Sequence, residues 1–172
     1  MNIETKHLIL KPPTVDSLNE AGKLWEDDKV RMFLGGAIPS EKVQEKTALL
    51  QAHWDKYKFG LYTVFLKDTS KIIGLCGLHH SEFESDIELS YMFFPEYWGK
   101  GLATETILAC LEEGFKKLKL KRIIAITQKA NIASCRLLKK SGMHLVYEFF
   151  RFDAEQQRYE KRCFDKIKRD PL

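Results

Sequence analysis

The sequence predicts an α+β fold built on a mixed sheet, and three observations lead to this expectation. Strand-like and helix-like segments alternate along all 172 residues in the order βααβββαβαββ. Three apolar strand segments follow one another between residues 61 and 94, separated only by short polar turns. A strongly amphipathic helix follows at 101–118. No linker or repeat divides the chain, so we expect residues 1–172 to form a single domain.

The first 60 residues are expected to hold one strand and two helices. The strand covers 3–10 and stops at a pair of prolines. Thr14 is a good N-cap for a first helix that reaches residue 25, where a loop with two glycines follows. Ser40 is expected to cap a second helix, 40–57, in which the core-facing residues recur four, three, four and three positions apart.

The remainder of the chain supplies most of the sheet. Strands joined by short turns pair antiparallel, so the three strands between residues 61 and 94 should form a meander. A helix, a strand, a second helix and a closing hairpin complete the fold. The predicted strands are 61–66, 72–78, 87–94, 122–127, 144–152 and 158–167, and the predicted helices are 101–118 and 132–140.

Composition excludes several classes of protein. With 44% hydrophobic and 30% charged residues, the chain is neither disordered nor embedded in a membrane, and its charged N-terminus does not resemble a signal peptide. We therefore expect a cytoplasmic protein with no membrane partner. The four cysteines lie far apart, without a CxxC pair or metal-ligand spacing to histidine. They indicate reduced, mostly buried thiols and no metal site.

The net charge of +4 is modest, and its densest basic run covers residues 116–122. Cations at a helix C-terminus interact favourably with the helix dipole, which accounts for this run. A nucleic-acid surface would be expected to interleave aromatic stacking residues with the charges, and none are present in the run. The sequence therefore does not predict a nucleic-acid partner.

A turn with two glycines precedes the helix at 101–118. Gly99 and Gly101 have no side chains, so an anion can approach the main chain, and the first N–H groups of a helix have no intrahelical partner. The turn does not match GxxxxGK[ST], and Thr104 occupies the place of the third glycine of GxGxxG. The pattern indicates a pyrophosphate cradle that is neither an ATP nor a dinucleotide fingerprint.

Two motifs carry a resemblance to a known family. Residues 98–103, WGKGLA, resemble the Q/R-x-x-G-x-G/A signature of the GNAT N-acetyltransferase superfamily. The stretches 88–91 and 95–105, together with 131–143, resemble the branch that acetylates the N-terminal amines of ribosomal proteins. The similarity spans nearly the whole chain. It implies a GNAT-like, mixed and mostly antiparallel central sheet of about seven strands, flanked by about four helices.

The resemblance also implies acetyl-CoA as acyl-donor cosubstrate and assigns its contacts. Main-chain amides of the first motif would hold the pyrophosphate, and the pantetheine arm would lie between splayed parallel strands at 87–94 and 122–127. A main-chain N–H at a strand bulge near Phe93 would bind the developing oxyanion. The residues assigned to cofactor binding are Met92, Phe93, Phe94, Trp98, Gly99, Lys100, Gly101, Leu102, Ala103, Thr104 and Asn131. Trp98 replaces the signature Gln or Arg, and Leu138 stands where many members carry a catalytic tyrosine.

A protonated amine cannot attack a thioester until it loses a proton, so a base is expected. Glu88 is the first candidate, because strand alternation places it with Ser90 on the face opposite the apolar residues. An exposed or ion-paired glutamate is the alternative. His79 and His80 are rival bases in the preceding loop. Ser134, by the resemblance, passes a proton toward the CoA sulfur, or it only caps a helix after Asn131.

The resemblance therefore predicts an N-acetyltransferase that transfers an acetyl group from acetyl-CoA to a primary amine by direct attack in a ternary complex. The acceptor is either a protein N-terminus or a small-molecule amine, and the protein is a monomer or a homodimer. The alternative is a non-catalytic acyl-CoA-binding regulatory module. Three aromatic residues are candidates for the wall of the acceptor cleft, or else belong to the core: Trp25, Phe33 and Trp54.

Overall fold

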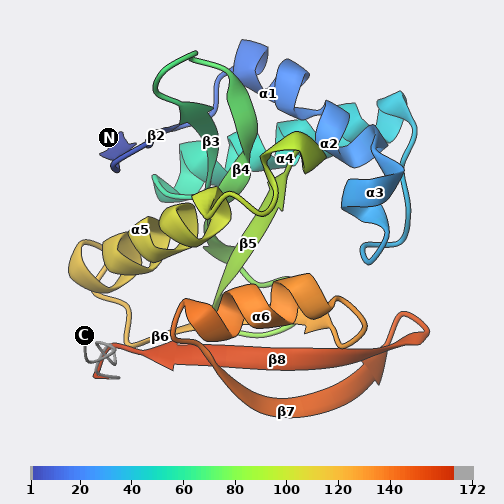
Figure 1. The fold of residues 1–172 in the computed structure, drawn as a ribbon, viewed down its shortest axis with the longest axis vertical. Coiled ribbons are helices and arrows are strands. Elements are labelled where there is room, and N and C mark those ends of the chain that lie inside the picture. Colours follow the sequence, from blue (N-terminus) through green and yellow to red (C-terminus); the bar gives the residue numbers. More distant parts are fainter. Residues whose placement is uncertain (1, 165–172) are drawn as a thin grey trace.

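A computed structural model describes residues 2–164 and contains one eight-stranded sheet in that part of the chain (Figure 1). The strand order is β1-β2-β3-β4-β5-β6-β8-β7, and every pairing is antiparallel except that of β5 with β6. The strands are β1 (Ile3–Glu4), β2 (Leu8–Lys11), β3 (Leu61–Leu66), β4 (Ile72–His80), β5 (Ile87–Phe93), β6 (Arg122–Gln128), β7 (His144–Arg151) and β8 (Ala154–Arg162). The predicted mixed, mostly antiparallel α+β fold is confirmed.

The helices cover both faces of the sheet (Figure 1). They are α1 (Val15–Ala21), α2 (Lys23–Glu26), α3 (Asp28–Arg31), α4 (Ser40–Tyr57), α5 (Leu102–Lys116) and α6 (Ile132–Lys140), with a 3-10 turn, η1, at Pro95–Tyr97. Helices α5 and α6 bury their apolar faces with the larger hydrophobic core. Helices α1, α2 and the start of α4 enclose a second core on the opposite face. No helix in residues 2–164 is long and apolar enough to cross a membrane.

The segment predicted as one strand, 3–10, is instead a small hairpin. Ile3 pairs with Leu10 across a turn at residues 5–7, and the side chain of Thr5 hydrogen bonds with main-chain groups of Leu8 inside that turn. Such local side-chain bonds compete with an extended ladder. The carboxylate of Glu105, in the first turn of α5, also accepts hydrogen bonds from Thr5 Oγ1 and from the main-chain N–H of His7. The turn is therefore fixed by a contact 100 residues away in sequence.

The first predicted helix is also divided. Thr14 caps α1 as expected, with reciprocal bonds to Ser17, but the helix ends at Ala21. A Cβ at Gly22 would lie 2.9 Å from Val43 Cγ1, so the glycine allows α1 and α4 to approach closely. Asp27 then caps α3. The prediction that Ser40 is the N-cap of the second helix is wrong by one residue. Ser40 is the first residue of α4, and the N-cap is Pro39, whose side chain makes no capping bond.

The closing hairpin begins its second strand earlier than predicted. The predicted strand starts at residue 158, but residues 154–157, AEQQ, already belong to β8 after a two-residue turn at 152–153. Gln156 and Gln157 are buried there because their amides are satisfied: they donate to the carbonyl of Arg151 and to the carboxylate of Glu148. The predicted end of this strand, 165–167, lies outside the described residues.

The parallel strands β5 and β6 separate along their length. Both have seven residues, yet they pair only at Glu88 and Ile124. Strand β5 remains paired with β4 along its whole length, and β6 with β8. The sheet is therefore split at its centre, as the resemblance predicted, and the gap opens toward the C-terminal end of β5, which leads through η1 to α5 (Figure 1).

Candidate active site

The start of α5 has unoccupied main-chain donors. Gly99 and Gly101 have φ values of 71° and 79°, in the left-handed region that favours glycine, and together they turn the chain into the helix. Gly101 is the N-cap, and no side chain caps this end. The first helical bond joins the N–H of Glu105 to the carbonyl of Gly101, so the three N–H groups of residues 102–104 precede the intrahelical ladder.

The surroundings of this turn suit an anion. A Cβ built on Gly99 or Gly101 would meet nothing within 4 Å, so the main chain is open on that side. Lys100 is exposed beside the turn, with its ammonium over the Tyr97 ring. The side chain of Leu102 is buried in the core, which leaves only its main chain to face a ligand. The groups present therefore fit the pyrophosphate of a nucleotide-linked ligand.

Trp98, which was assigned to cofactor binding, makes a structural contact within the protein. Its indole Nε1 donates to the carbonyl of Phe93 at 2.7 Å, while its ring is 48% exposed. The side chain thus ties the glycine turn back to the end of β5.

Trp98→Phe should remove this hydrogen bond and lower the free energy of unfolding by about 1 kcal/mol, the usual net value of one such bond. Urea denaturation measures the change. Acetyl-CoA should still stabilise the variant. A loss of that stabilisation, with folding intact, would mean that the indole itself contributes to the ligand site.

The end of β5 directs one main-chain donor into the gap. The N–H of Phe94 bonds to the carbonyl of Ile73 in β4, so alternation turns the N–H of Phe93 away from β4, toward the side where β6 has diverged. The bulge expected near Phe93 is wrong, because residues 87–93 pair one to one with β4. The splay of the strands exposes this donor without a bulge. The side chain of Phe93 is buried, whereas Met92 and Phe94 pack partly buried against the second core.

Glu88 lies at the single pairing point of the two parallel strands and lines a pocket of about 400 Å³. Its Oε2 accepts a hydrogen bond from Ser81 Oγ at 2.7 Å, and its other oxygen takes part in no hydrogen bond within residues 2–164. The pocket is lined by Phe33, Leu34, Gly35, Glu88, Ile126, Thr127, Gln128, Arg151, Phe152 and Gln156. A half-buried carboxylate with one fixed oxygen and one open oxygen is suited to accept a proton.

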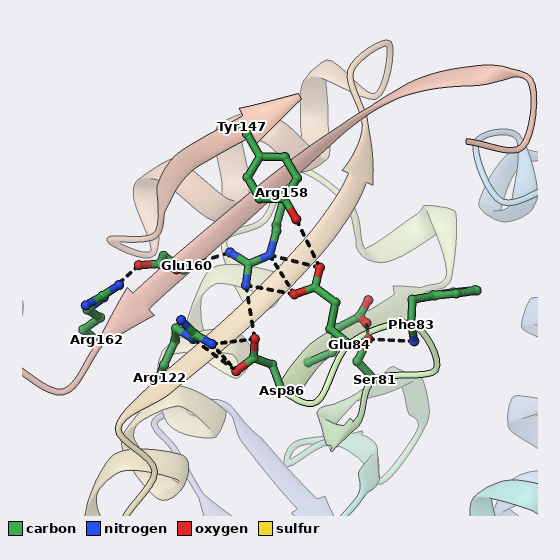
Figure 2. Close-up of polar contacts among 10 residues, drawn as sticks. Ser81, Phe83, Glu84, Asp86, Arg122, Tyr147, Arg158, Glu160 and Arg162 are labelled. Carbon is green, nitrogen blue, oxygen red and sulfur yellow. Dashed lines mark hydrogen bonds and ion pairs between the residues drawn. The ribbon is translucent and has the colours of Figure 1, made fainter. Parts of the chain in front are cut away.

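An ion-pair network fixes the loop that holds Ser81 (Figure 2). The guanidinium of Arg158, 6% exposed in β8, pairs with Glu84 at 2.9 Å and with Asp86 at 3.2 Å. Arg122 of β6 holds the same Asp86 at 2.8 Å. The connection between β4 and β5 is thereby attached to β6 and β8, across the line where the sheet splits. This attachment holds the segment from Ser81 to Glu88 in place.

The rival base His79 is paired with Glu88 in the β4–β5 register. Its Nδ1 lies 2.8 Å from the carbonyl of His80, and its Nε2 lies 2.7 Å from Ser90 Oγ. A carbonyl can only accept, so Nδ1 carries a proton and, in the neutral ring, Nε2 accepts from Ser90. The His79–Ser90 pair therefore adjoins Glu88 on one face of the sheet. His80 is exposed and packs instead against the rings of Tyr57 and His53.

Ser134 makes two contacts, of which the first is the predicted capping contact, while its role as a proton donor stays a prediction. Its main-chain N–H donates to the side chain of Asn131, which caps α6, and its Oγ lies 2.7 Å from the hydroxyl of Tyr91. Burial raises the pKa of Tyr91, so the phenol stays protonated at neutral pH. Sequence reasoning missed Tyr91, although strand alternation could have placed it on the α6 side of β5. The Asn131 side chain is occupied by capping.

The three aromatic residues proposed for the acceptor cleft lie in different parts of the fold. Phe33 lines the pocket beside Glu88, whereas Trp25 and Trp54 are buried in the two cores. Sequence reasoning did not single out Arg151, Phe152 or Arg158. All three come from the β7–β8 hairpin, whose second strand was misplaced, and they reach the pocket or its supporting network only through tertiary pairing.

An uncapped helix N-terminus lies at the end of two splayed parallel strands, with a carboxylate-lined pocket beside them, and this is the arrangement expected from the sequence resemblance. Comparison with known proteins agrees. The acetyltransferase (GNAT) domain profile matches residues 7–144, and the chain belongs to this family. A curated relative, the uncharacterized N-acetyltransferase YnaD of Bacillus subtilis (strain 168), is 31% identical over 143 residues, covering 83% of this chain and 82% of that protein.

Solved structures support the same fold. An acetyltransferase (GNAT family) from Bacillus anthracis superposes with a TM-score of 0.82 at 24% identity, covering 95% of this chain and 99% of that one. Spermidine N-acetyltransferase from Vibrio cholerae, in complex with CoA and spermine, superposes with a TM-score of 0.79 at 20% identity, covering 94% and 98%. Ribosomal-protein acetyltransferases share the fold at 17% identity or less, as one of several groups of neighbours. The chain therefore belongs to the GNAT family, and these structures do not assign it to the ribosomal-protein branch.

Proposed function

We propose that this protein transfers the acetyl group of acetyl-CoA to a primary amine in a ternary complex. The observation that carries the proposal is the uncapped N-terminus of α5, entered through Gly99 and Gly101, at the open end of the β5–β6 gap. Main-chain donors of residues 101–104 and the ammonium of Lys100 would hold the pyrophosphate. The gap between the strands would hold the pantetheine arm.

Acetyl-CoA supplies a thioester carbonyl that an amine can attack. Glu88 is the proposed base, because its open oxygen lines the pocket and can take the proton that the amine must lose. The N–H of Phe93 is the proposed donor to the negative charge that develops on the thioester oxygen. The C–N bond forms, the C–S bond breaks, and the sulfur receives a proton. Ser134, oriented by the hydroxyl of Tyr91, is the proposed route for that proton.

Acetyl-CoA should raise the melting temperature of the full chain. A ligand that binds only the folded state stabilises it by about 2.7 kcal/mol at about 100 times its Kd, which corresponds to about 5–10 °C for a protein of this size. Differential scanning fluorimetry measures this shift. Release of CoA thiol with a panel of amines, including an N-terminal peptide, spermidine and amino acids, measures transfer.

The two readouts separate the alternatives. A melting shift together with thiol release supports the transferase. A shift without release from any amine would favour a regulatory module that binds acyl-CoA and has no activity. No shift at millimolar acetyl-CoA would contradict both.

A further inference from the structure

The pocket beside Glu88 contains one carboxylate and one guanidinium. Glu88 enters from β5 and Arg151 from the end of β7, and the other lining residues carry no charge. Phe33, Leu34 and Phe152 give the pocket an apolar side, and Gln128 and Gln156 give it neutral polar groups. An occupant that complements this lining has one positive group and one negative group.

Arg151 is held by aromatic rings and by no carboxylate. Its guanidinium carbon lies 3.8 Å from the centre of the Phe83 ring, and the rings of Phe149 and Phe152 lie at 5.0 and 5.2 Å. Its Nε is buried and has no hydrogen-bond partner within the described residues. Cation–π contacts fix the position of a guanidinium while leaving its in-plane N–H groups free to donate.

Four acidic residues of the β4–β5 loop and the β7–β8 hairpin are paired with other cations. Glu84 and Asp86 bind Arg158 and Arg122 (Figure 2). Glu148 and Glu155 bind Lys129. Among residues 2–164, Arg151 has no ion pair with a carboxylate. Within this part of the chain, its N–H groups therefore have no acceptor.

We infer that the acceptor is a primary amine that also carries a carboxylate, as an amino acid does, with Arg151 as the residue that binds the carboxylate. The inference rests on the proposed acetyl transfer and names the substrate class of that site. Arg151 would hold the carboxylate through paired N–H donors, which places the amine of the same molecule toward Glu88. The apolar side formed by Phe33, Leu34 and Phe152 would contact the side chain of the substrate.

Other amines fit this lining less well. A polyamine such as spermidine would place a second cation in a pocket that already contains Arg151, with only one carboxylate to compensate. A phosphate monoester carries up to two negative charges against a single guanidinium, beside the negative charge of Glu88. A zwitterion with one charge of each sign leaves the filled pocket electrically balanced.

Matched acceptors test this inference. We would measure kcat/KM for thiol release with L-leucine, L-leucinamide and 3-methylbutylamine, and likewise with L-phenylalanine, its amide and phenethylamine, beside spermidine and an alanine-initiated peptide amide. The wild-type protein should prefer the carboxylates over their amides by about tenfold or more, the usual range for a hydrogen bond to a charged group. In Arg151→Met this ratio should collapse toward one. In Arg136→Met, which removes an exposed charge outside the pocket, the ratio should be unchanged.

A binding measurement separates this inference from the proposed function. Carboxylate-bearing amines should raise the melting temperature of the CoA-saturated wild-type protein, and Arg151→Met should abolish that rise whether or not any amine is acetylated. Absence of thiol release with every amine would overturn acetyl transfer while this rise still supports the carboxylate site. If amides, spermidine or the peptide match the amino acids, or if Arg151→Met weakens all acceptors equally, the carboxylate site is wrong. The carboxylate site is also wrong if no carboxylate-bearing amine causes either a rise in melting temperature or thiol release.

Discussion

Replacing Glu88 by glutamine should lower turnover by about a hundredfold or more while leaving the affinity for acetyl-CoA unchanged. A positioned general base contributes about a hundredfold to ten-thousandfold, and the amide cannot take the proton of the attacking amine. Packing should be spared, because the amide oxygen of glutamine can still accept the hydrogen bond from Ser81. Steady-state kinetics with the best acceptor gives kcat, and thermal shift gives the acetyl-CoA affinity.

The pH profile adds a second readout to Glu88→Gln. The wild-type rate should fall as the pH is lowered, because protonation of the base removes its acceptor oxygen, and the variant should lack this limb while keeping the part of the fall that comes from protonation of the free amine. Glu82→Gln is a matched control, since it removes an exposed carboxylate from the loop just before β5. It should retain both the rate and the limb.

His79 is the alternative that this experiment can expose. If Glu88→Gln keeps the wild-type rate and pH limb, the carboxylate has only a structural role. In that case His79→Gln should remove the limb, because Nε2 of His79 is bonded to Ser90 on the same face of the sheet. The two variants together identify which side chain takes the proton.

The cofactor side of the site could be predicted because its information is local in sequence. Gly99 and Gly101 precede an amphipathic helix directly, and the left-handed conformation they adopt requires no tertiary contact. The alternation along β5 likewise separated Glu88 from its apolar neighbours and placed it on the correct face. Short-range spacing therefore gave the glycine turn and the position of Glu88 on the sheet, while their roles in cofactor binding and proton transfer stay predictions.

The pocket beside Glu88, where we propose that the acceptor binds, could not be predicted in the same way. Arg151 and Arg158 lie on opposite sides of the connection predicted at 153–157, and only the pairing of β8 with β6 brings Arg158 to Glu84. The same limit applies to the first strand, where a hydrogen bond from Thr5 to the carboxylate of Glu105 in α5 stabilises a turn inside an apolar run. Long-range polar contacts determine where these strands and turns begin and end. Such contacts leave no periodic signal in the sequence.

Gly101→Val should abolish stabilisation by acetyl-CoA. The glycine has φ of 79°, and a Cβ there would project into open space with no protein atom within 4 Å. The branched side chain would therefore occupy the side from which a pyrophosphate reaches the main-chain donors. A β-branched residue at this φ also strains the backbone by about 1–3 kcal/mol, so the melting temperature of the unliganded variant should fall as well.

Gly36→Val separates the two effects. Gly36 has φ of 81° and equally open surroundings, but it lies in the loop before α4, away from α5. Both variants should lose a similar amount of stability, because the backbone strain is the same in kind. Only Gly36→Val should still show the melting shift with acetyl-CoA. If Gly101→Val retains the wild-type shift, the phosphates bind elsewhere; if both variants lose it, the loss reflects backbone strain and not a blocked cradle.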